Sequence, residues 1–310
     1  MVISFLKLIR FQNLLMIALM QCLFHYGFLS MQPFALALHN WQFALLVIST
    51  VCIAGAGYLI NNLIDQETDA VNQKNLGLIG GSISEKMAYN AYFTLNIVGV
   101  IAGFIISNSI QKPNFATVFI LISVVLYLYA TTFKQIVLIG NLIIAVLIAF
   151  SVIIIPIFDL YPIINLENQP LIATLFQIIL DYAFFAFLIN LIREIIKDLE
   201  DINGDKQQSI STLPIIIGVS KTIGFVLILS SIIIIYLFYY CYEYYFKNNL
   251  IASALYQIIF VLSPLLYFCL QLSKSKTQSD FHHLSSVLKL VLFFGIFSVM
   301  IITLNIKYNA

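Results

Sequence analysis

The chain has 310 residues, of which 61% are hydrophobic and only 9% charged, and its formal net charge is +1 at pH 7. Soluble domains carry about 25% charged residues, so this composition excludes an ordinary soluble protein, a disordered chain and a disulfide scaffold. Long unbroken apolar runs also exclude a transmembrane barrel, whose strands would alternate. We therefore expect an all-α, polytopic membrane protein. The net charge itself says nothing about nucleic acid, but the Lys and Arg residues form no basic face, and we expect no nucleic-acid partner.

Apolar runs of about 20 residues between polar breaks mark segments long enough to cross a bilayer as helices. In chain order they give nine expected spans: 13–32, 42–64, 88–109, 115–133, 136–157, 172–196, 213–240, 250–272 and 286–306. The break at 133–136 is short, so eight spans with one long hairpin remain an alternative. No long polar segment divides the chain, and we expect residues 1–310 to form a single membrane-embedded domain.

Basic residues are distributed unequally between the two expected sides of the membrane. With nine spans, only Lys112, Lys247 and Lys307 of the 15 Lys and Arg residues fall on one side. Because Lys and Arg concentrate in cytoplasmic loops, the other side is expected to face the cytoplasm. Most acidic residues also lie on that side, in two short segments. We therefore expect an integral, multi-pass protein of the cell membrane with its active site facing the cytoplasm.

The first acidic segment, at residues 61–69 (NNLIDQETD), ends the second expected span. Its side chains Asn61, Asp65 and Asp69 are spaced i, i+4, i+8, and on a continuing helix they share one face. A solvated helix end can carry charged residues in the same way. One such segment therefore supports a functional site only weakly.

The second acidic segment, at residues 193–205 (REIIKDLEDINGD), ends the sixth expected span on the same side. Asp198, Asp201 and Asp205 are spaced i, i+3, i+7, which again places them on one face. Two such stripes on one side of the membrane are much harder to explain by solvation alone. Carboxylates at this density repel each other unless a cation lies between them, so the pattern predicts a bound cation.

Oxygen ligands without His or Cys suit Mg²⁺, which binds one or two carboxylates and completes its shell with water and phosphate oxygens. Arg193 and Lys197 add positive charge for a phosphate group. The two stripes and the nearby cations thus predict a site for a metal-bridged diphosphate. The expected metal ligands are Asn61, Asp65, Asp69, Asp198, Asp201 and Asp205.

These motifs resemble the two signatures of the UbiA family of intramembrane prenyltransferases. The stretch IRFQNL at residues 9–14 also resembles that family's opening Arg…Asn element. The sequence departs from the family in two places: Asn62 stands where Asp is frequent, and Asn75-Leu76 stands where many members have Arg-Pro. The second departure removes a cation that could bind diphosphate.

The resemblance implies a ring of about nine helices around a central cavity and Mg²⁺-dependent transfer of a prenyl group from a prenyl diphosphate. It implies geranylgeranyl or farnesyl diphosphate as donor, a lipid-soluble acceptor, the bilayer as surroundings and no obligate protein partner. The implied catalytic residues are Asp65, Asp69, Asp198 and Asp201. The implied diphosphate contacts are Asn61, Arg193, Lys197, Arg10 and Asn13.

The sequence leaves several acceptors as alternatives. The run REIIKD and the following Thr212-Leu213-Pro214 are most similar to the archaeal-type branch, which alkylates geranylgeranylglyceryl phosphate, an ether-lipid precursor. An aromatic acceptor in quinone synthesis and a haem are alternatives. A membrane transporter is an alternative from another class, but transporters place their polar groups near the midplane. Donor length and oligomeric state are likewise open.

Three further polar features have no assigned role in the sequence. His25 lies in the middle of the first expected span, and Asp181 lies within the sixth. The adjacent residues His282 and His283 follow the eighth span, and two neighbouring side chains point to different faces of a helix. The histidine pair is therefore interpreted as part of a polar loop.

Overall fold

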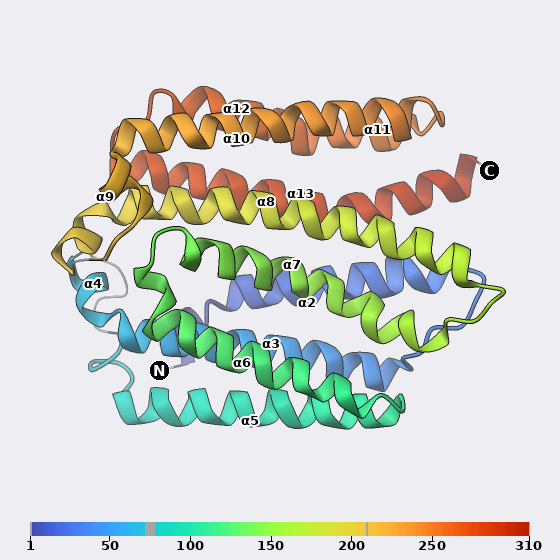
Figure 1. Cartoon of the computed structure of the whole chain (residues 1–310), viewed down its shortest axis with the longest axis horizontal. Coiled ribbons are helices and arrows are strands. Elements are labelled where there is room, and N and C mark those ends of the chain that lie inside the picture. Colours follow the sequence, from blue (N-terminus) through green and yellow to red (C-terminus); the bar gives the residue numbers. More distant parts are fainter. Residues whose placement is uncertain (1, 72–77, 209, 310) are drawn as a thin grey trace.

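The computed structural model describes residues 2–71, 78–208 and 210–309. Over these ranges, nine helical segments are long and apolar enough to cross a membrane, as the sequence predicts. They lie side by side along one direction (Figure 1). Their bounds are Phe11–Met31, Asn40–Ile64, Glu85–Ser109, Pro113–Thr131, Ile139–Ile163, Gln169–Gln207, Val219–Phe246, Ile251–Leu272 and Gln278–Tyr308.

The helices that build these spans are joined by short turns. The α-helices are α1 (Val2–Leu8), α2 (Phe11–Gly27), α3 (Asn40–Ile64), α4 (Gln66–Val71), α5 (Glu85–Ser109), α6 (Ala116–Thr131), α7 (Ile139–Asp159), α8 (Gln169–Gln207), α9 (Leu213–Ile217), α10 (Val219–Tyr240), α11 (Ile251–Gln257), α12 (Ser263–Leu272) and α13 (Gln278–Asn309). Short 3₁₀ turns are η1 (Leu29–Met31), η2 (Pro113–Phe115), η3 (Phe133–Gln135) and η4 (Tyr161–Ile163). Two π-helical segments, η5 (Cys241–Phe246) and η6 (Ile258–Leu262), continue α10 and join α11 to α12.

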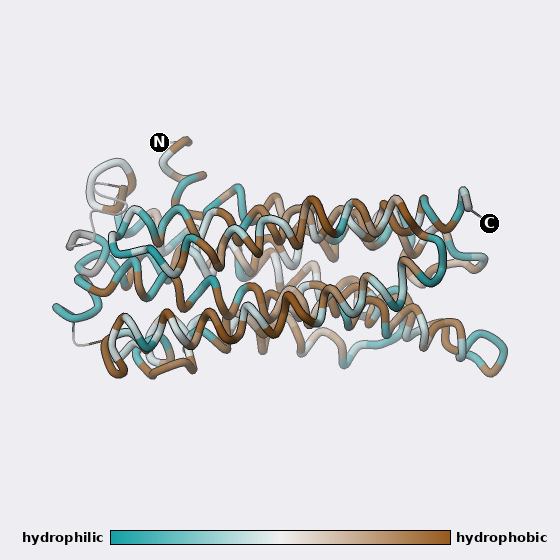
Figure 2. The backbone as a smooth tube through the Cα atoms, turned by 90° about the horizontal axis from the view of Figure 1, so that it is seen from above, coloured by the Kyte–Doolittle hydropathy of each residue, from teal (hydrophilic) through white to brown (hydrophobic). Residues whose placement is uncertain are grey.

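The outer surface of the bundle is apolar along the middle of the helices. Hydrophilic stretches gather toward the two ends of the bundle (Figure 2). Large apolar side chains such as Ile97, Phe104 and Ile235 are 57%, 57% and 68% exposed. Water would make such a surface strongly unfavourable, whereas lipid chains accommodate it. The fold is therefore that of an integral, multi-pass membrane protein, in agreement with the prediction.

The turn between α6 and α7 decides the number of spans. The short helix η3 occupies 133–135, and Leu138 adopts a left-handed backbone conformation with φ 61°. The chain reverses direction there. Over the described residues the expectation of nine spans is confirmed, and the alternative of eight spans with one long hairpin is wrong.

Three expected boundaries are displaced. Helix α8 continues to Gln207, well past the apolar run, because charged residues end hydrophobicity but not helix formation. Helix α13 begins at Gln278, so His282 and His283 lie in a helix and the expected polar loop is wrong. The expected span 213–240 is divided into α9 and α10 at Gly218, whose φ of 87° is readily adopted only by glycine.

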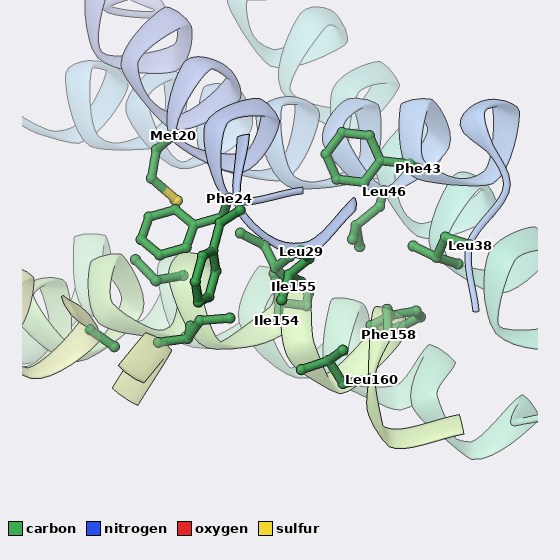
Figure 3. Close-up of a cluster of buried hydrophobic side chains, with 14 of the residues drawn as sticks. Met20, Phe24, Leu29, Leu38, Phe43, Leu46, Ile154, Ile155, Phe158 and Leu160 are labelled. Atoms are coloured by element: carbon green, nitrogen blue, oxygen red, sulfur yellow. The ribbon is translucent and has the colours of Figure 1, made fainter. Parts of the chain in front are cut away.

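The largest buried cluster joins α2, α3 and α7. It contains Phe24, Phe43 and Leu46, which pack near Ile155 and Phe158 of α7 (Figure 3). All five side chains are at most 2% exposed. Lipid chains are as apolar as these side chains, so moving the side chains from lipid into the bundle gains little hydrophobic free energy. Close packing therefore holds these helices together.

Helices α2, α3, α6, α7, α8 and α13 enclose an internal cavity. Side chains from all six line it, whereas α5, α10 and the α11–α12 span lie outside and contribute none within the described ranges. The predicted arrangement of helices around a central cavity is thus observed. The two acidic segments lie at the same end of the bundle, where α4 packs near the last turns of α8 (Figure 1).

Candidate active site

The first acidic stripe lies where α3 passes into α4. The helix is interrupted at Asp65, so the continuous helix expected here is not formed. However, the Asp65 amide donates to the Asn61 carbonyl at 2.9 Å, and the Asp69 amide donates to the Asp65 carbonyl at 2.8 Å. This i→i+4 pattern preserves the helical spacing through the break. The three side chains consequently line the same cavity, as the spacing predicts.

The second stripe lies on the last turns of α8. Asp198, Asp201 and Asp205 all line the cavity, so the shared helix face is present. The Asn141 amide, from α7, donates to Asp198 Oδ2 at 2.9 Å. That hydrogen bond fixes the orientation of the Asp198 carboxylate from a neighbouring helix.

Both stripes meet in one cavity of about 500 Å³. Its polar lining comes from α3, α4, η3, α7, α8 and α13, together with Arg10 and Thr212, and the other lining side chains are mostly apolar. The lining residues predicted from sequence are Arg10, Asn61, Asp65, Asp69, Arg193, Lys197, Asp198, Asp201 and Asp205. The structure therefore brings together side chains that are separated by more than a hundred positions in the chain.

Basic side chains are interleaved with the acidic ones. Lys197 Nζ donates to Glu194 Oε1 at 2.5 Å, and Arg193 lies 3.6 Å from the same oxygen. Glu194 is a cavity-lining carboxylate that belongs to neither stripe. Because Glu194 holds both cations near the cavity, they are positioned to meet an anionic ligand there.

Arg10 and Asn13 reach the site from the N-terminal helices. The Arg10 guanidinium lies 5.2 Å from the ring centroid of Tyr58, a cation–π contact, and it lines the cavity. Asn13 lies behind the same ring, where its amide donates to the Tyr58 hydroxyl at 3.2 Å. Asn13 lines an adjoining smaller pocket rather than the main cavity. Asn13 therefore does not line the cavity in which the diphosphate contact is expected.

Three cavity residues that contact an acidic side chain from outside both acidic segments were not predicted from the sequence. Lys134, on η3, contacts the carboxylate of Asp65, and Asn141 holds Asp198. His282 Nδ1 lies 3.1 Å from Glu200 Oε1, and this histidine lines the cavity from α13 instead of belonging to a polar loop. An isolated polar residue in an apolar chain is the only signal that could have pointed to them.

The donor set suits a divalent metal that is completed by phosphate. Within the described part of the chain, no three His, Cys, Asp or Glu side chains converge closely enough to enclose an ion by themselves. Magnesium commonly takes only one or two carboxylates and fills its shell with water and phosphate oxygens. Among the residues that the structure describes, the buried side-chain oxygen of Asn61 has no hydrogen-bond partner, so it is available to bind a cation.

A comparison with protein families shows to which family the chain belongs. The model of the UbiA prenyltransferase family matches residues 18–287. The chain belongs to the UbiA prenyltransferase family. It is therefore a prenyltransferase, an enzyme that transfers an alkyl group, as the resemblance implied, and not a transporter.

Individual relatives agree with this assignment. A digeranylgeranylglyceryl phosphate synthase of Methanosphaera stadtmanae is 32% identical over 271 residues, which cover 85% of this chain and 89% of that protein. Among solved structures, a digeranylgeranylglyceryl phosphate synthase has a TM-score of 0.60 at 22% identity, covering 96% of this chain and 98% of the other. A UbiA homologue of Archaeoglobus fulgidus, solved with GPP and Mg²⁺, has a TM-score of 0.57 at 15% identity, covering 96% and 99%.

The structure explains one of the two departures from the UbiA pattern. The Asn62 amide donates to the carbonyl oxygens of Leu8 and Tyr58, at 2.8 and 2.9 Å. A carboxylate cannot donate these bonds, so Asn62 stabilises the junction of α1 and α3 and does not line the cavity. The second departure, Asn75-Leu76, lies outside the described residues.

The polar residues left without a role lie elsewhere in the prenyltransferase. His25 Nδ1 lies 2.7 Å from Asp159 Oδ2, and its ring stacks on Phe43 with centroids 3.8 Å apart. This pair is buried at the end of the bundle opposite the acidic stripes. Asp181 accepts a hydrogen bond of 3.0 Å from Gln177 and lines a separate small pocket. Neither residue lines the main cavity.

Proposed function

We propose that this prenyltransferase transfers the prenyl group of a prenyl diphosphate to a hydroxyl group of a geranylgeranylglyceryl phosphate-like ether lipid. The observation that carries the proposal is that two acidic stripes, from α3–α4 and from α8, line one cavity within an apolar bundle. The acceptor class is supported by relatives of this chain that are named digeranylgeranylglyceryl phosphate synthase, one of them matched over 85% of this chain.

Magnesium is the proposed cofactor, held between the two stripes together with the donor's diphosphate. The proposed ligands are Asn61, Asp65 and Asp69 on one side and Asp198, Asp201 and Asp205 on the other. When bound, Mg²⁺ neutralises diphosphate charge and makes it a better leaving group. The solved A. fulgidus homologue with GPP and Mg²⁺ supports this choice of metal.

The chain's own cations complete the proposed diphosphate site. Arg193 and Lys197 lie on the same helix as the second stripe, and Arg10 approaches from the N-terminal side. Their charge offsets the negative charge of the diphosphate before and after the bond breaks. Asn13 acts through Tyr58, whose ring it orients by a hydrogen bond. We assign it a positioning role.

The apolar part of the cavity provides the place for the prenyl chain. Its wall includes Ile17, Phe119, Leu126 and Ile154, which come from α2, α6 and α7. Water is poorly accommodated there, which protects the developing allylic cation, and aromatic faces stabilise its positive charge. We propose geranylgeranyl or farnesyl diphosphate as the donor.

The transfer step balances without a further reagent. The bond between the allylic carbon and the diphosphate oxygen breaks, and its electron pair leaves with the diphosphate. The acceptor's hydroxyl oxygen forms the new bond to that carbon. The hydroxyl proton passes to an oxygen of the released diphosphate. The products are an ether lipid and diphosphate.

We further propose that the acidic end of the bundle faces the cytoplasm, because Lys and Arg are concentrated there. Residues 1–310 are proposed to act as one membrane-embedded domain that needs no protein partner. A test of orientation is accessibility of single cysteines to a membrane-impermeant reagent in sealed cells. Cysteine at Lys206 should be protected, and cysteine at Lys247 should be labelled.

The activity test uses the purified full chain in lipid nanodiscs. Geranylgeranyl and farnesyl diphosphates are offered with Mg²⁺ and a panel of acceptors, and products are identified by mass spectrometry. Asp65→Ala and Asp201→Ala should each lower the rate by on the order of 100-fold or more, since a lost metal ligand costs a few kcal/mol of transition-state stabilisation. Glu243→Gln is the matched control, because Glu243 pairs with Lys247 at the opposite end of the bundle.

Two outcomes would contradict the proposal. A product with an aromatic head group and none with the glyceryl phosphate would overturn the acceptor class. Unchanged diphosphate release in both aspartate variants would overturn the assignment of the stripes.

A further inference from the structure

A second pocket of about 110 Å³ adjoins the main cavity. It is lined by α2, α7, α8 and α13, and it shares with the main cavity a wall that includes Tyr58 and Arg193. A molecule seated in the second pocket would therefore have one end beside the proposed diphosphate site.

The second pocket is elongated and changes polarity along its length. On α2 its wall runs from Asn13 to Phe24, and on α8 from Arg193 to Tyr182. Each interval of eleven residues corresponds to about 16 Å of helix. The end near Asn13 and Arg193 is polar, whereas the other end is built from aromatic and aliphatic side chains. This shape matches an amphiphile with a polar head and an apolar chain.

The polar end of the second pocket is cationic. Lys289 of α13 lines it together with Arg193, and Lys289 lies within electrostatic reach of Arg193 and Arg10. Within the described ranges, Lys289 has no carboxylate in ion-pair contact, and its side-chain hydrogen bond is a long one of 3.4 Å to Gln12. The Arg193 Nε is buried and has no hydrogen-bond partner in the described part of the chain. A lysine without a paired carboxylate beside an arginine with an unsatisfied N–H group indicates a binding site for an anionic ligand.

The second pocket differs from the main cavity in one decisive way. No Asp or Glu among the described residues lines it, whereas both acidic stripes line the main cavity. A diphosphate with its metal therefore belongs in the main cavity. An anion in the second pocket would be held by Lys289 and Arg193 directly, without a metal.

We propose that the second pocket binds the acceptor, with Lys289 recognising the phosphate monoester of its head group and the apolar end holding the start of its chain. This inference rests on the proposed function, which it deepens by assigning the acceptor's place. Lys289 thus determines specificity for a phosphorylated lipid over its uncharged alcohol. The shared wall brings the acceptor's hydroxyl group close to the allylic carbon of the donor.

The test compares wild type with Lys289→Gln and Lys289→Arg in nanodiscs. In the Gln variant, the KM for geranylgeranylglyceryl phosphate should rise about tenfold or more, as expected for loss of a charge-assisted hydrogen bond. The KM for the prenyl diphosphate should change less than twofold, and the Arg variant should retain acceptor binding. Lys221→Gln, an exposed lysine on α10 that lines neither pocket, is the matched control.

A second measurement separates recognition from a folding defect. Wild type and Lys289→Gln are each offered the phosphorylated acceptor and geranylgeranylglycerol, which lacks the phosphate. Wild type should prefer the phosphorylated acceptor, and the variant should lose most of that preference while still releasing diphosphate slowly from the donor alone. A preserved preference, or an equal rise in the KM of donor and acceptor, would overturn the inference. A wild type that makes no product from the phosphorylated acceptor would instead overturn the proposed function.

Discussion

The amino group of Lys134 directly contacts the carboxylate of Asp65, and both residues line the main cavity. Lys134 belongs to η3, between α6 and α7, whereas Asp65 ends α3. The contact places a cation at the first acidic stripe, although the chain lacks the Arg-Pro pair that many family members carry after that stripe. A lysine from another part of the chain thus supplies positive charge at this site.

Replacing Lys134 with Met should weaken binding of the donor. The KM for the prenyl diphosphate should rise by about tenfold, because a charge-assisted hydrogen bond to a phosphate contributes roughly 1.5–3 kcal/mol. Lys134→Arg should recover most of the loss. Initial rates measured against donor concentration provide the check. A donor KM that stays at the wild-type value would show that Lys134 only pairs with Asp65.

Asn141→Leu should change the requirement for Mg²⁺. The substitution removes the 2.9 Å hydrogen bond that orients Asp198. Loss of a residue that orients a metal ligand typically costs about 10–100-fold in metal affinity. The Mg²⁺ concentration for half-maximal rate should rise accordingly.

A matched control for this change is Asn96→Leu. The Asn96 amide donates within its own helix, to the Tyr92 carbonyl at 3.0 Å, on a helix that does not line the cavity. This variant should show the wild-type dependence on Mg²⁺. An Asn141 variant with the same dependence would indicate that Asp198 does not bind the metal.

Removal of Mg²⁺ with EDTA should abolish transfer, and added Mg²⁺ should restore it. Mg²⁺ together with inorganic diphosphate should also raise the Tm, since a ligand at 100 times its Kd stabilises the folded state by about 2.7 kcal/mol. Thermal unfolding in detergent measures the shift. Without ligand, Asp65→Ala should unfold at the wild-type Tm. Mg²⁺ with diphosphate should not raise the Tm of this variant. A full shift in that variant would contradict a ligand site at Asp65.

The buried pair of His25 and Asp159 should matter for stability and not for donor binding. The two side chains are 3% and 0% exposed, 2.7 Å apart, and at the end of the bundle opposite the acidic stripes. Asp159→Ala leaves His25 without its partner, and breaking a buried pair costs about 3–5 kcal/mol. The Tm should fall, while the donor KM should stay within twofold of wild type. The double variant His25→Phe/Asp159→Leu should recover part of the stability.

The nine spans could be predicted from the sequence because the bilayer fixes the length of an apolar helix. The limits of α8 and α13 could not, since hydropathy falls at the first charged residue whereas a helix of Glu, Lys and Asp continues. The two stripes were predictable because each is contained in one segment, and their side chains line one cavity. Their roles in catalysis remain predictions.

Lys134, Asn141 and His282 could not be found in this way. Each contacts an acidic residue on a different helix, more than fifty positions away. Helical spacing relates neighbours within a segment and contains no information about which segments lie together. Lys289 could not be predicted for the same reason. It lies in an apolar stretch of α13 and reaches the second pocket only because α13 packs against α2 and α8.

The contact between α2 and α13 joins the first transmembrane span to the ninth. Membrane proteins emerge from the ribosome starting at the N-terminus, so α2 enters the bilayer long before α13 exists. Lys289 and the wall around it are then among the last parts to arrive. Assembly of the pocket proposed for the acceptor is thereby coupled to completion of membrane insertion, and an unfinished chain lacks the α13 face that packs against α2.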